Sequence, residues 1–184
     1  MKLQAKVKLG NKLKSIKIGI LGGTFDPAHK GHLQISKHAK NKFDLKKVIW
    51  AITKKNPFKN KSYLDIKKRI KLAKKISSKN KFIKVRFFEN KIKSNKTVNL
   101  ISHLKKNNKS VEIYFIMGAD NLINFHKWYR WKEIASKSIL LVFNREKYKT
   151  KSLRSITYKK YNNIRLKFVN FKKINISSSK LRNI

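Results

Sequence analysis

Two histidines three residues apart stand out in this sequence, because a glycine pair and a hydroxyl side chain precede them. Residues 22–32 read GGTFDPAHKGH, and the apolar run 16–21 lies directly before them. Glycine allows a backbone to approach a ligand closely, and Thr24 adds a hydroxyl donor. At the start of a helix, His29 and His32 face the same anion together with the unpaired N–H groups and the positive end of the helix dipole. The pattern predicts a phosphate cradle.

A second candidate anion site lies near the C-terminus, where residues 176–182 read ISSSKLR. Serines that open a helix offer hydroxyl and backbone donors at its positive end. Arg182 falls three residues after Ser179 and therefore on the same face of that helix. Alone, this segment is typical of an ordinary helix cap. Its occurrence together with the first motif favours a shared role in phosphate binding.

A third segment follows the apolar run 111–117, and its polar and aromatic residues suit a nucleotide substrate. It reads MGADNL and then WYRW at 128–131. Asp120 offers a carboxylate, and Trp128 offers a ring that stacks on a flat heterocycle. The alternative is that Trp128 and Trp131 are core aromatics of an amphipathic helix.

A metal centre is the main competing interpretation of the paired histidines. The chain has no cysteine, which excludes disulfides and thiolate metal sites. Few acidic residues lie near His29 and His32, so the ligands needed to complete a structural metal site are missing from the surrounding sequence.

The segments that must position these residues alternate between strand and helix patterns. We expect strands at 16–21, 47–52, 81–88, 111–117, 138–143 and 164–169. We expect helices at 30–42, 62–77 (with Ser62 as its cap), 96–105 and 121–135, the last in two pieces, and a short helix from 176. Residues 147–163 are polar and show no clear pattern. The alternation predicts an α/β fold, a Rossmann-like doubly wound parallel sheet with helices on both faces. Such sheets bind ligands at the carboxyl ends of their strands.

The length of 184 residues fits one domain. We expect a single domain over 16–184, preceded by a basic extension at 1–15, for which a targeting segment is the alternative. No apolar stretch approaches the ~18 residues of a membrane span, and no apolar signal-peptide core is present. A cytoplasmic location is therefore expected.

The net charge of +41, from 49 Lys and Arg against 8 Asp and Glu, raises a second functional class, the basic nucleic-acid-binding module. Two observations argue against specific binding. The lysines are spread along the whole chain, and the 42 lysines far outnumber the 7 arginines, whose fork suits base and phosphate recognition. No RRM, KH or zinc motif is present. A solvated basic surface is the simpler interpretation.

Together, the motifs resemble those of a known enzyme family. The segment 22–32 resembles the (T/H)xGH signature of the nucleotidyltransferase superfamily, with His29 and His32 as its two histidines. The serine segment resembles the ISSTxIR-type element of the superfamily, with Ser179 where many relatives have Thr. The MGAD and Trp128 segment is similar to that of bacterial nicotinate-nucleotide adenylyltransferases.

This resemblance implies that nicotinate mononucleotide and ATP react to give nicotinate adenine dinucleotide and pyrophosphate, in NAD biosynthesis. The implied catalytic residues are His29, His32 and Arg182. The implied ATP-binding residues are Gly22, Gly23, Thr24, Phe25, His29, His32, Gly118, Asp120, Ser177, Ser178, Ser179 and Arg182. The implied substrate-binding residues are Lys59, Thr97, Trp128 and Tyr129. Mg²⁺ is expected as the cofactor, bound through ATP and not through a protein site.

Two other substrates remain open within the superfamily. Phosphopantetheine adenylyltransferases share a similar first motif and an Ile-Ser-Ser-Ser element but lack the MGAD and Trp segment. Nicotinamide mononucleotide differs from the nicotinate compound by one charge, and a basic protein favours the carboxylate. The sequence also departs from the family at Phe58, Lys96 and Leu100, where relatives carry His, Tyr and Thr.

Overall fold

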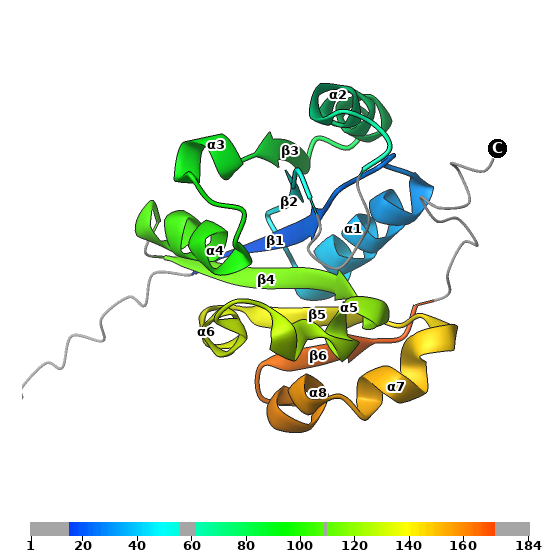
Figure 1. Ribbon diagram of the computed structural model, residues 1–184, viewed down its shortest axis with the longest axis vertical. Coiled ribbons are helices and arrows are strands. Elements are labelled where there is room, and N and C mark those ends of the chain that lie inside the picture. Colours follow the sequence, from blue (N-terminus) through cyan, green and yellow to red (C-terminus); the bar gives the residue numbers. More distant parts are fainter. Residues whose placement is uncertain (1–14, 56–61, 109, 172–184) are drawn as a thin grey trace, which may run out of the picture.

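Six parallel strands form one sheet at the centre of the molecule, in the order β3-β2-β1-β4-β5-β6 (Figure 1). The computed structural model describes residues 15–55, 62–108 and 110–171. The strands are β1 (Ile16–Gly23), β2 (Lys47–Ile52), β3 (Ile83–Phe87), β4 (Val111–Gly118), β5 (Ile139–Phe143) and β6 (Leu166–Val169). From β1 the chain adds β2 and β3 on one side, and then β4, β5 and β6 on the other side. The carboxyl ends of β1 and β4 therefore mark the topological switch point, where ligands bind in folds of this type.

Helices cover both faces of the sheet, which confirms the predicted fold class. They are α1 (Lys30–Phe43), α2 (Ile66–Ser77), α3 (Glu89–Ile92), α4 (Thr97–Lys106), α5 (Ala119–Ile123), α6 (Trp131–Lys137), α7 (Lys149–Leu153) and α8 (Ile156–Tyr161), with single 3₁₀ turns η1 (Phe125–Lys127) and η2 (Glu146–Tyr148). One apolar cluster packs α1 and α2 against the sheet, and a second packs α4, α5, α6 and α8 against the other face (Figure 1).

The strands are apolar throughout because both faces of the sheet are buried. β4 is buried at six of its eight positions, and Leu140 to Val142 of β5 are fully buried. Continuous apolar runs, rather than alternation, were the signal that located these strands in the sequence.

Several sequence-based boundaries differ from the structure by one to four residues, and three segments illustrate the reasons. The helix predicted from Ser62 begins at Ile66, because Asp65 accepts a hydrogen bond from the backbone N–H of Lys68, whereas the Ser62 hydroxyl donates to the Lys54 carbonyl. The strand predicted to reach residue 88 ends at Phe87, and Glu89 begins the short helix α3. The segment 147–163, which showed no pattern, contains α7 and α8, with Ser155 as the cap of α8.

The predicted basic extension lies almost wholly outside the described residues, as does the predicted helix from 176. Among the residues that the structure describes, no helix is long and apolar enough to cross a membrane.

Candidate active site

The two motif histidines form the N-terminal cap of α1. The N-cap residue is His29, whose Nδ1 accepts a hydrogen bond from the backbone N–H of Gly31 at 3.1 Å. His32, at the third helical position, accepts from the backbone N–H of His29 through its own Nδ1 at 3.2 Å. This reciprocal arrangement is a capping box built from imidazoles. Because each Nδ1 accepts a backbone hydrogen bond, a neutral ring in this arrangement carries its proton on Nε2.

The rings of this pair are held close together and against the core. The ring centroids of His29 and His32 lie 3.9 Å apart. The His32 ring also lies 4.7 Å from the ring of Phe25, and Phe25 stacks on Trp50 at 5.1 Å. Phe25 is buried, so its ring supports His32 within the protein.

A buried hydrogen-bonded chain fixes the first turn of α1 on strand β2. The indole N–H of Trp50 donates to the Ser36 hydroxyl at 2.8 Å, and that hydroxyl donates to the carbonyl of His32, also at 2.8 Å. The position of the second motif histidine therefore depends on a contact with the neighbouring strand.

The glycine pair is part of a strand and does not form a turn. Gly22 and Gly23 are the last residues of β1, and no described glycine has a positive φ. The left-handed residue in this loop is Phe25, at φ 48°. A Cβ on either glycine would make only ordinary contacts, at 3.7 Å from the nearest side-chain atom. Their value here is an open backbone surface, since both glycines line the adjacent cavity.

A buried arginine ties the phosphate-cradle loop to the end of β2. Arg69 of α2 is 2% exposed, and its guanidinium donates to the carbonyls of Thr24 (2.7 Å), Thr53 (2.8 Å), Leu64 (3.0 Å) and Lys54 (3.2 Å). Burial lowers the pKa of Arg69, and the nearby carboxylates of Asp26, Asp65 and Glu89 oppose that shift.

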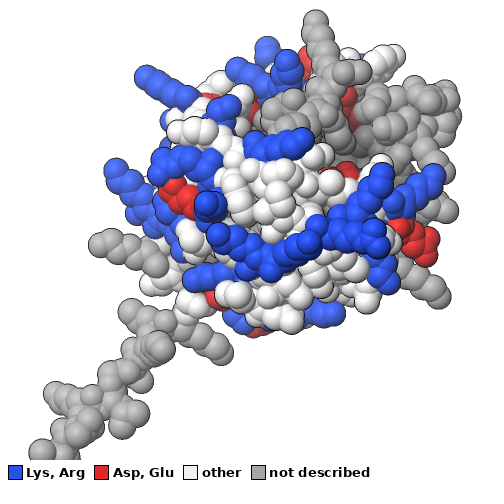
Figure 2. All heavy atoms as spheres, turned by 60° about the horizontal axis from the view of Figure 1, so that its bottom comes forward, with Lys and Arg blue, Asp and Glu red and all other residues white. Residues whose placement is uncertain are grey.

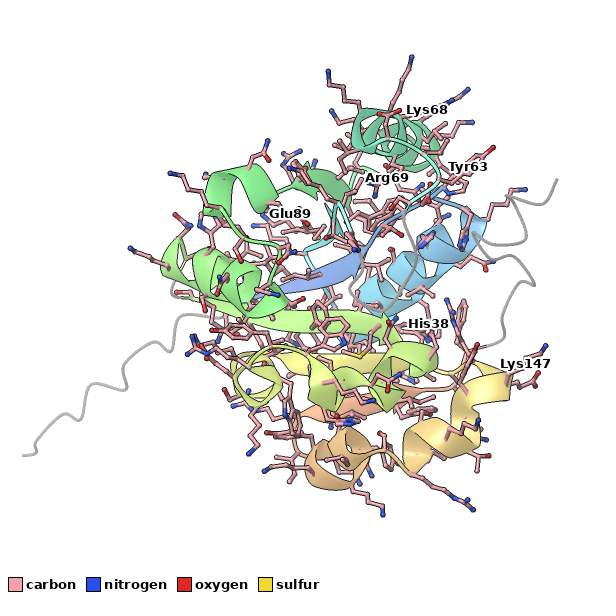
Figure 3. All side chains as sticks on the ribbon, viewed as in Figure 1. His38, Tyr63, Lys68, Arg69, Glu89 and Lys147 are labelled. Carbon is pink, nitrogen blue, oxygen red and sulfur yellow. The ribbon has the colours of Figure 1, made fainter. Side chains whose placement is uncertain are left out.

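Asp26 of the same loop fixes the segment that leads into α2. Its carboxylate accepts from the backbone N–H groups of Tyr63 at 2.6 Å and Leu64 at 2.9 Å. Asp26 and Arg69 therefore hold the loop after β1 and the segment before α2 together, and Figure 3 labels Arg69 and Tyr63 on this side of the sheet.

A cavity of about 370 Å³ opens beside the end of β1. Its wall combines the carboxyl ends of β1 and β2 with α3, the start of α4 and the turn before α6. The lining residues are Gly22, Gly23, Ala51, Ile52, Thr53, Lys55, Phe88, Glu89, Ile92, Ser94, Asn95, Lys96, Thr97, Leu100, Phe115, Lys127, Trp128, Tyr129 and Ile134. The wall is largely apolar, with a few charged groups at defined points, which is typical of a site for a small molecule that carries an aromatic ring.

A third polar feature lies at the end of β4. Asp120, in the first turn of α5, accepts a hydrogen bond from Nη1 of Arg145 at 3.1 Å. Its other oxygen, Oδ1, is buried and has no hydrogen-bond partner among the described residues. A Cβ at position 118 would lie 2.4 Å from that oxygen, so Gly118 leaves room for the carboxylate.

The comparisons with known proteins agree on one family. Residues 20–184 match the cytidylyltransferase-like family model. A protein of Pelagibacter ubique described as a probable nicotinate-nucleotide adenylyltransferase is 67% identical over 171 residues, which are 93% of this chain and 94% of that protein. One of Aliarcobacter butzleri with the same description is 36% identical over 140 residues, covering 76% of this chain and 77% of that protein.

The chain belongs to the nicotinate-nucleotide adenylyltransferase family. Solved structures share the fold. A nicotinic acid mononucleotide adenylyltransferase of Plasmodium falciparum, complexed with NaAD, superposes with a TM-score of 0.72 at 18% identity, over 91% of this chain and 83% of that one. A protein of Vibrio parahaemolyticus, titled a putative nicotinate-nucleotide adenylyltransferase, superposes with a TM-score of 0.64 at 19% identity, over 91% and 85% of the two chains.

In this adenylyltransferase two of the predicted groups of site residues lie next to each other at the end of β1. Gly22 and Gly23 belong to the histidine motif and also line the cavity that contains Thr97, Trp128 and Tyr129. Asp120 and Gly118 lie at the end of the neighbouring strand β4. The predicted residues Lys59, Ser177, Ser178, Ser179 and Arg182 lie outside the described residues.

The two tryptophans of this segment have different surroundings. Trp128 packs on the core rings of Phe125 (5.3 Å) and Phe115 (6.0 Å) and also lines the cavity. Trp131 packs against Phe125 and Tyr161 and does not line the cavity. Trp128 can therefore offer a ring whose orientation is fixed by the core.

Sequence reasoning missed three charged residues at the site of the adenylyltransferase. Arg145 follows the carboxyl end of β5. The predicted strand was a signal for it, because ligands bind at the carboxyl ends of strands in such sheets. Arg69 lies in a helix that is otherwise rich in lysine. That it is the one arginine of α2 was the signal that the sequence offered. Glu89 lines the cavity from α3 and accepts hydrogen bonds from the Thr53 hydroxyl and from the Lys54 N–H (3.0 Å), which fixes the end of β2 (Figure 3).

Proposed function

We propose that this chain transfers the adenylyl group of ATP to nicotinate mononucleotide, giving nicotinate adenine dinucleotide and pyrophosphate. One observation carries the proposal. A histidine-capped helix start suited to phosphates and an aromatic-lined cavity suited to a pyridine ring meet at the end of β1, through Gly22 and Gly23. Membership of the family supports the same reaction.

The ATP phosphates are assigned to the start of α1. His29 and His32 each hold a proton on Nε2, and the helix N-terminus adds its dipole. In our assignment His32 lies nearest the transferring phosphorus, and Gly22, Gly23 and Thr24 contribute backbone donors. Ser177, Ser178, Ser179 and Arg182 are assigned to the β- and γ-phosphates from the sequence motif, outside the described residues.

The ATP ribose is assigned to Asp120. The unpartnered Oδ1 of this carboxylate is a strong acceptor whose burial without a hydrogen bond is costly, and a ribose hydroxyl would satisfy it. Arg145 holds the other oxygen, so the carboxylate keeps its orientation.

The mononucleotide is assigned to the cavity. Trp128 stacks on the pyridine ring, the backbone N–H of Tyr129 receives the carboxylate, and Thr97 contributes a hydroxyl at the same end. Lys59 is assigned to the mononucleotide phosphate from the sequence, in a segment outside the described residues.

The chemistry needs no activated side chain, because the mononucleotide phosphate is already a nucleophile at neutral pH. One of its oxygens forms a bond to the α-phosphorus of ATP while the bond to the pyrophosphate oxygen breaks. Catalysis then rests on alignment of the two substrates and on donors that neutralise charge on the leaving group. We propose that Mg²⁺ accompanies ATP, where it would offset negative charge on the phosphates. In the described part of the chain, no three His, Asp or Glu side chains gather in a metal-binding group.

The test is pyrophosphate release from ATP and Mg²⁺ with nicotinate mononucleotide, nicotinamide mononucleotide or phosphopantetheine, each at the same concentration. We expect the highest kcat/KM with nicotinate mononucleotide. Turnover with phosphopantetheine alone would contradict the substrate assignment while leaving the phosphate sites in place. No turnover with any of them would contradict the proposed reaction.

A further inference from the structure

The cavity assigned to the mononucleotide carries an excess of positive charge. Lys55, Lys96 and Lys127 line it, and Glu89 is the acidic residue in the same wall. Oε1 of Glu89 is engaged by the Thr53 hydroxyl and by the Lys54 N–H. The charge that a substrate meets in the cavity is therefore net positive, which favours an anionic group over a neutral one.

Lys96 is the lysine that lies against the residues assigned to the nicotinate end. It is the N-cap of α4, directly before Thr97, and no side chain caps this helix. Its Nζ lies 5.9 Å from the centroid of the Tyr129 ring, within the range of a cation–π contact. Tyr129 itself is 57% exposed, so this contact crosses the mouth of the cavity from α4 to the turn before α6.

The start of α4 adds a second positive contribution at the same place. The first N–H groups of a helix lack partners within it, and the helix dipole places partial positive charge there. Lys96 uses its own backbone N–H on the Ser94 hydroxyl at 3.1 Å. An ammonium group, the helix start and the Tyr129 segment thus converge on one wall of the cavity.

We propose that Lys96 is a specificity-determining residue, which makes this enzyme select the carboxylate of nicotinate mononucleotide over the neutral amide of nicotinamide mononucleotide. The inference rests on the proposed function and adds the origin of its substrate preference. The reason is electrostatic. The two substrates differ by one negative charge, and an ammonium group in the cavity wall stabilises only the charged one.

Lys127 is the closest competitor for this role, because it precedes Trp128 and lines the same cavity. Both side chains are exposed. Lys127 belongs to η1, whereas Lys96 extends over the Tyr129 ring. We therefore assign the larger share of the discrimination to Lys96.

The experiment measures the ratio of kcat/KM for nicotinate mononucleotide to kcat/KM for nicotinamide mononucleotide. The variants are Lys96→Met, which keeps the length of the side chain without its charge, Lys96→Arg, and Lys127→Met. Lys106→Met, at the exposed far end of α4, is the matched control. We expect Lys96→Met to lower the ratio about tenfold through loss of the nicotinate reaction alone. Lys96→Arg should restore most of it, and the effect should shrink at 1 M salt.

Several results would overturn the inference. The ratio would stay unchanged in Lys96→Met if the charge had no part in selection. Equal losses with both substrates would mean that Lys96 only shapes the wall, and a larger fall in Lys127→Met would move the role to that residue. If the wild-type protein turns over neither mononucleotide, the proposed function itself fails, which is distinct from a wild type that selects nicotinate without help from Lys96.

Discussion

At the scale of single residues, the motif histidines have a structural role and, in the proposed reaction, a chemical one as well. Their Nδ1 atoms cap α1, so a neutral ring in this arrangement carries its proton on Nε2. The spacing of three residues, which in the sequence indicated only that both rings face one anion, is also the spacing of a capping box. A test of the chemical role therefore requires a variant that keeps the cap of α1 and removes the imidazole.

Replacement of His32 separates the two roles. Gln is a standard residue at the third position of a capping box, so His32→Gln should keep the backbone contact to His29 and change the free energy of unfolding by less than about 0.5 kcal/mol. His32→Ala should lose both roles. In both variants we expect kcat to fall at least about tenfold, equivalent to ~1.4 kcal/mol in the barrier. Steady-state kinetics and urea unfolding on the same preparations measure the two effects, and near-wild-type turnover in His32→Gln would show that the imidazole is dispensable.

At the scale of elements, Arg69 connects three segments that the sequence presents far apart. Its guanidinium donates hydrogen bonds to carbonyl oxygens at the end of β2, in the loop after β1 and at the residue before the α2 cap. One buried side chain of α2 thus holds these segments, together with Asp26 of the loop after β1.

Loss of that guanidinium should be costly. We expect Arg69→Met to lower the free energy of unfolding by about 2–4 kcal/mol, since buried carbonyls lose their donor. Arg69→Lys should recover only part of this, because an ammonium cannot match the planar fork. Lys68→Met, the exposed neighbour on the same helix (Figure 3), is the control and should be within about 0.5 kcal/mol of wild type in urea unfolding. A small effect of Arg69→Met would mean that other groups hold these segments.

The helix α1 also carries a group that titrates. His38 lies 5.8 Å from the ring of Phe143 and 5.2 Å from that of Phe171, and its Nε2 has no partner among the described residues. Burial, and then the charge of Lys42, lower the pKa of His38 below 6.5. The folded state therefore favours the neutral ring.

The sign of the pH effect follows from that direction. A lowered pKa in the folded state contributes stability that is present above pH 6.5 and is lost as the pH falls below this value through the folded pKa. We expect the wild-type protein to lose stability between pH 7 and pH 5 more steeply than His38→Phe does. Thermal unfolding at a series of pH values measures this, and equal slopes for the two proteins would contradict it.

Much of the sheet was predictable at this scale, and the reasons for the exceptions are physical. The strands were found because a parallel sheet covered on both faces needs continuous apolar runs. The short helices α3, α7 and α8 were missed because they contain four to six residues, too few for a helical period to be visible. The start of α2 was misplaced because Ser62 and Asp65 are both good caps, and only the tertiary contact of Ser62 with Lys54 decides between them.

The site was predictable where a motif is local and not where partners come from different strands. The spacing of His29 and His32 predicted that both rings lie at the start of one helix, and the structure has them there. The pairing of Asp120 with Arg145 depends on the neighbouring positions of β4 and β5 in the sheet, which the sequence alone does not state. Likewise, Lys96 and Tyr129 meet only because α4 and the turn before α6 pack on the same face.

At the scale of the whole molecule, the strand order places the candidate site at the switch point of the sheet. β1 lies between β2 and β4, so its carboxyl end is flanked by the cavity and by the Asp120 segment. The surface is basic, and Figure 2 shows Lys and Arg side chains spread across the visible face with few acidic ones between them. The spread of charge is consistent with a general attraction of anionic substrates, and it leaves selectivity to individual groups at the site.

The central claim is that an adenylyl group moves intact from ATP to nicotinate mononucleotide. The most direct measurement uses ATP labelled at the α-phosphorus and, separately, at the γ-phosphorus, with chromatographic separation of the products. We predict that the α-label appears in nicotinate adenine dinucleotide in one-to-one ratio with released pyrophosphate, and that the γ-label appears only in pyrophosphate. Recovery of the α-label as free AMP, or of the γ-label on the mononucleotide, would contradict adenylyl transfer and the assignment of the site.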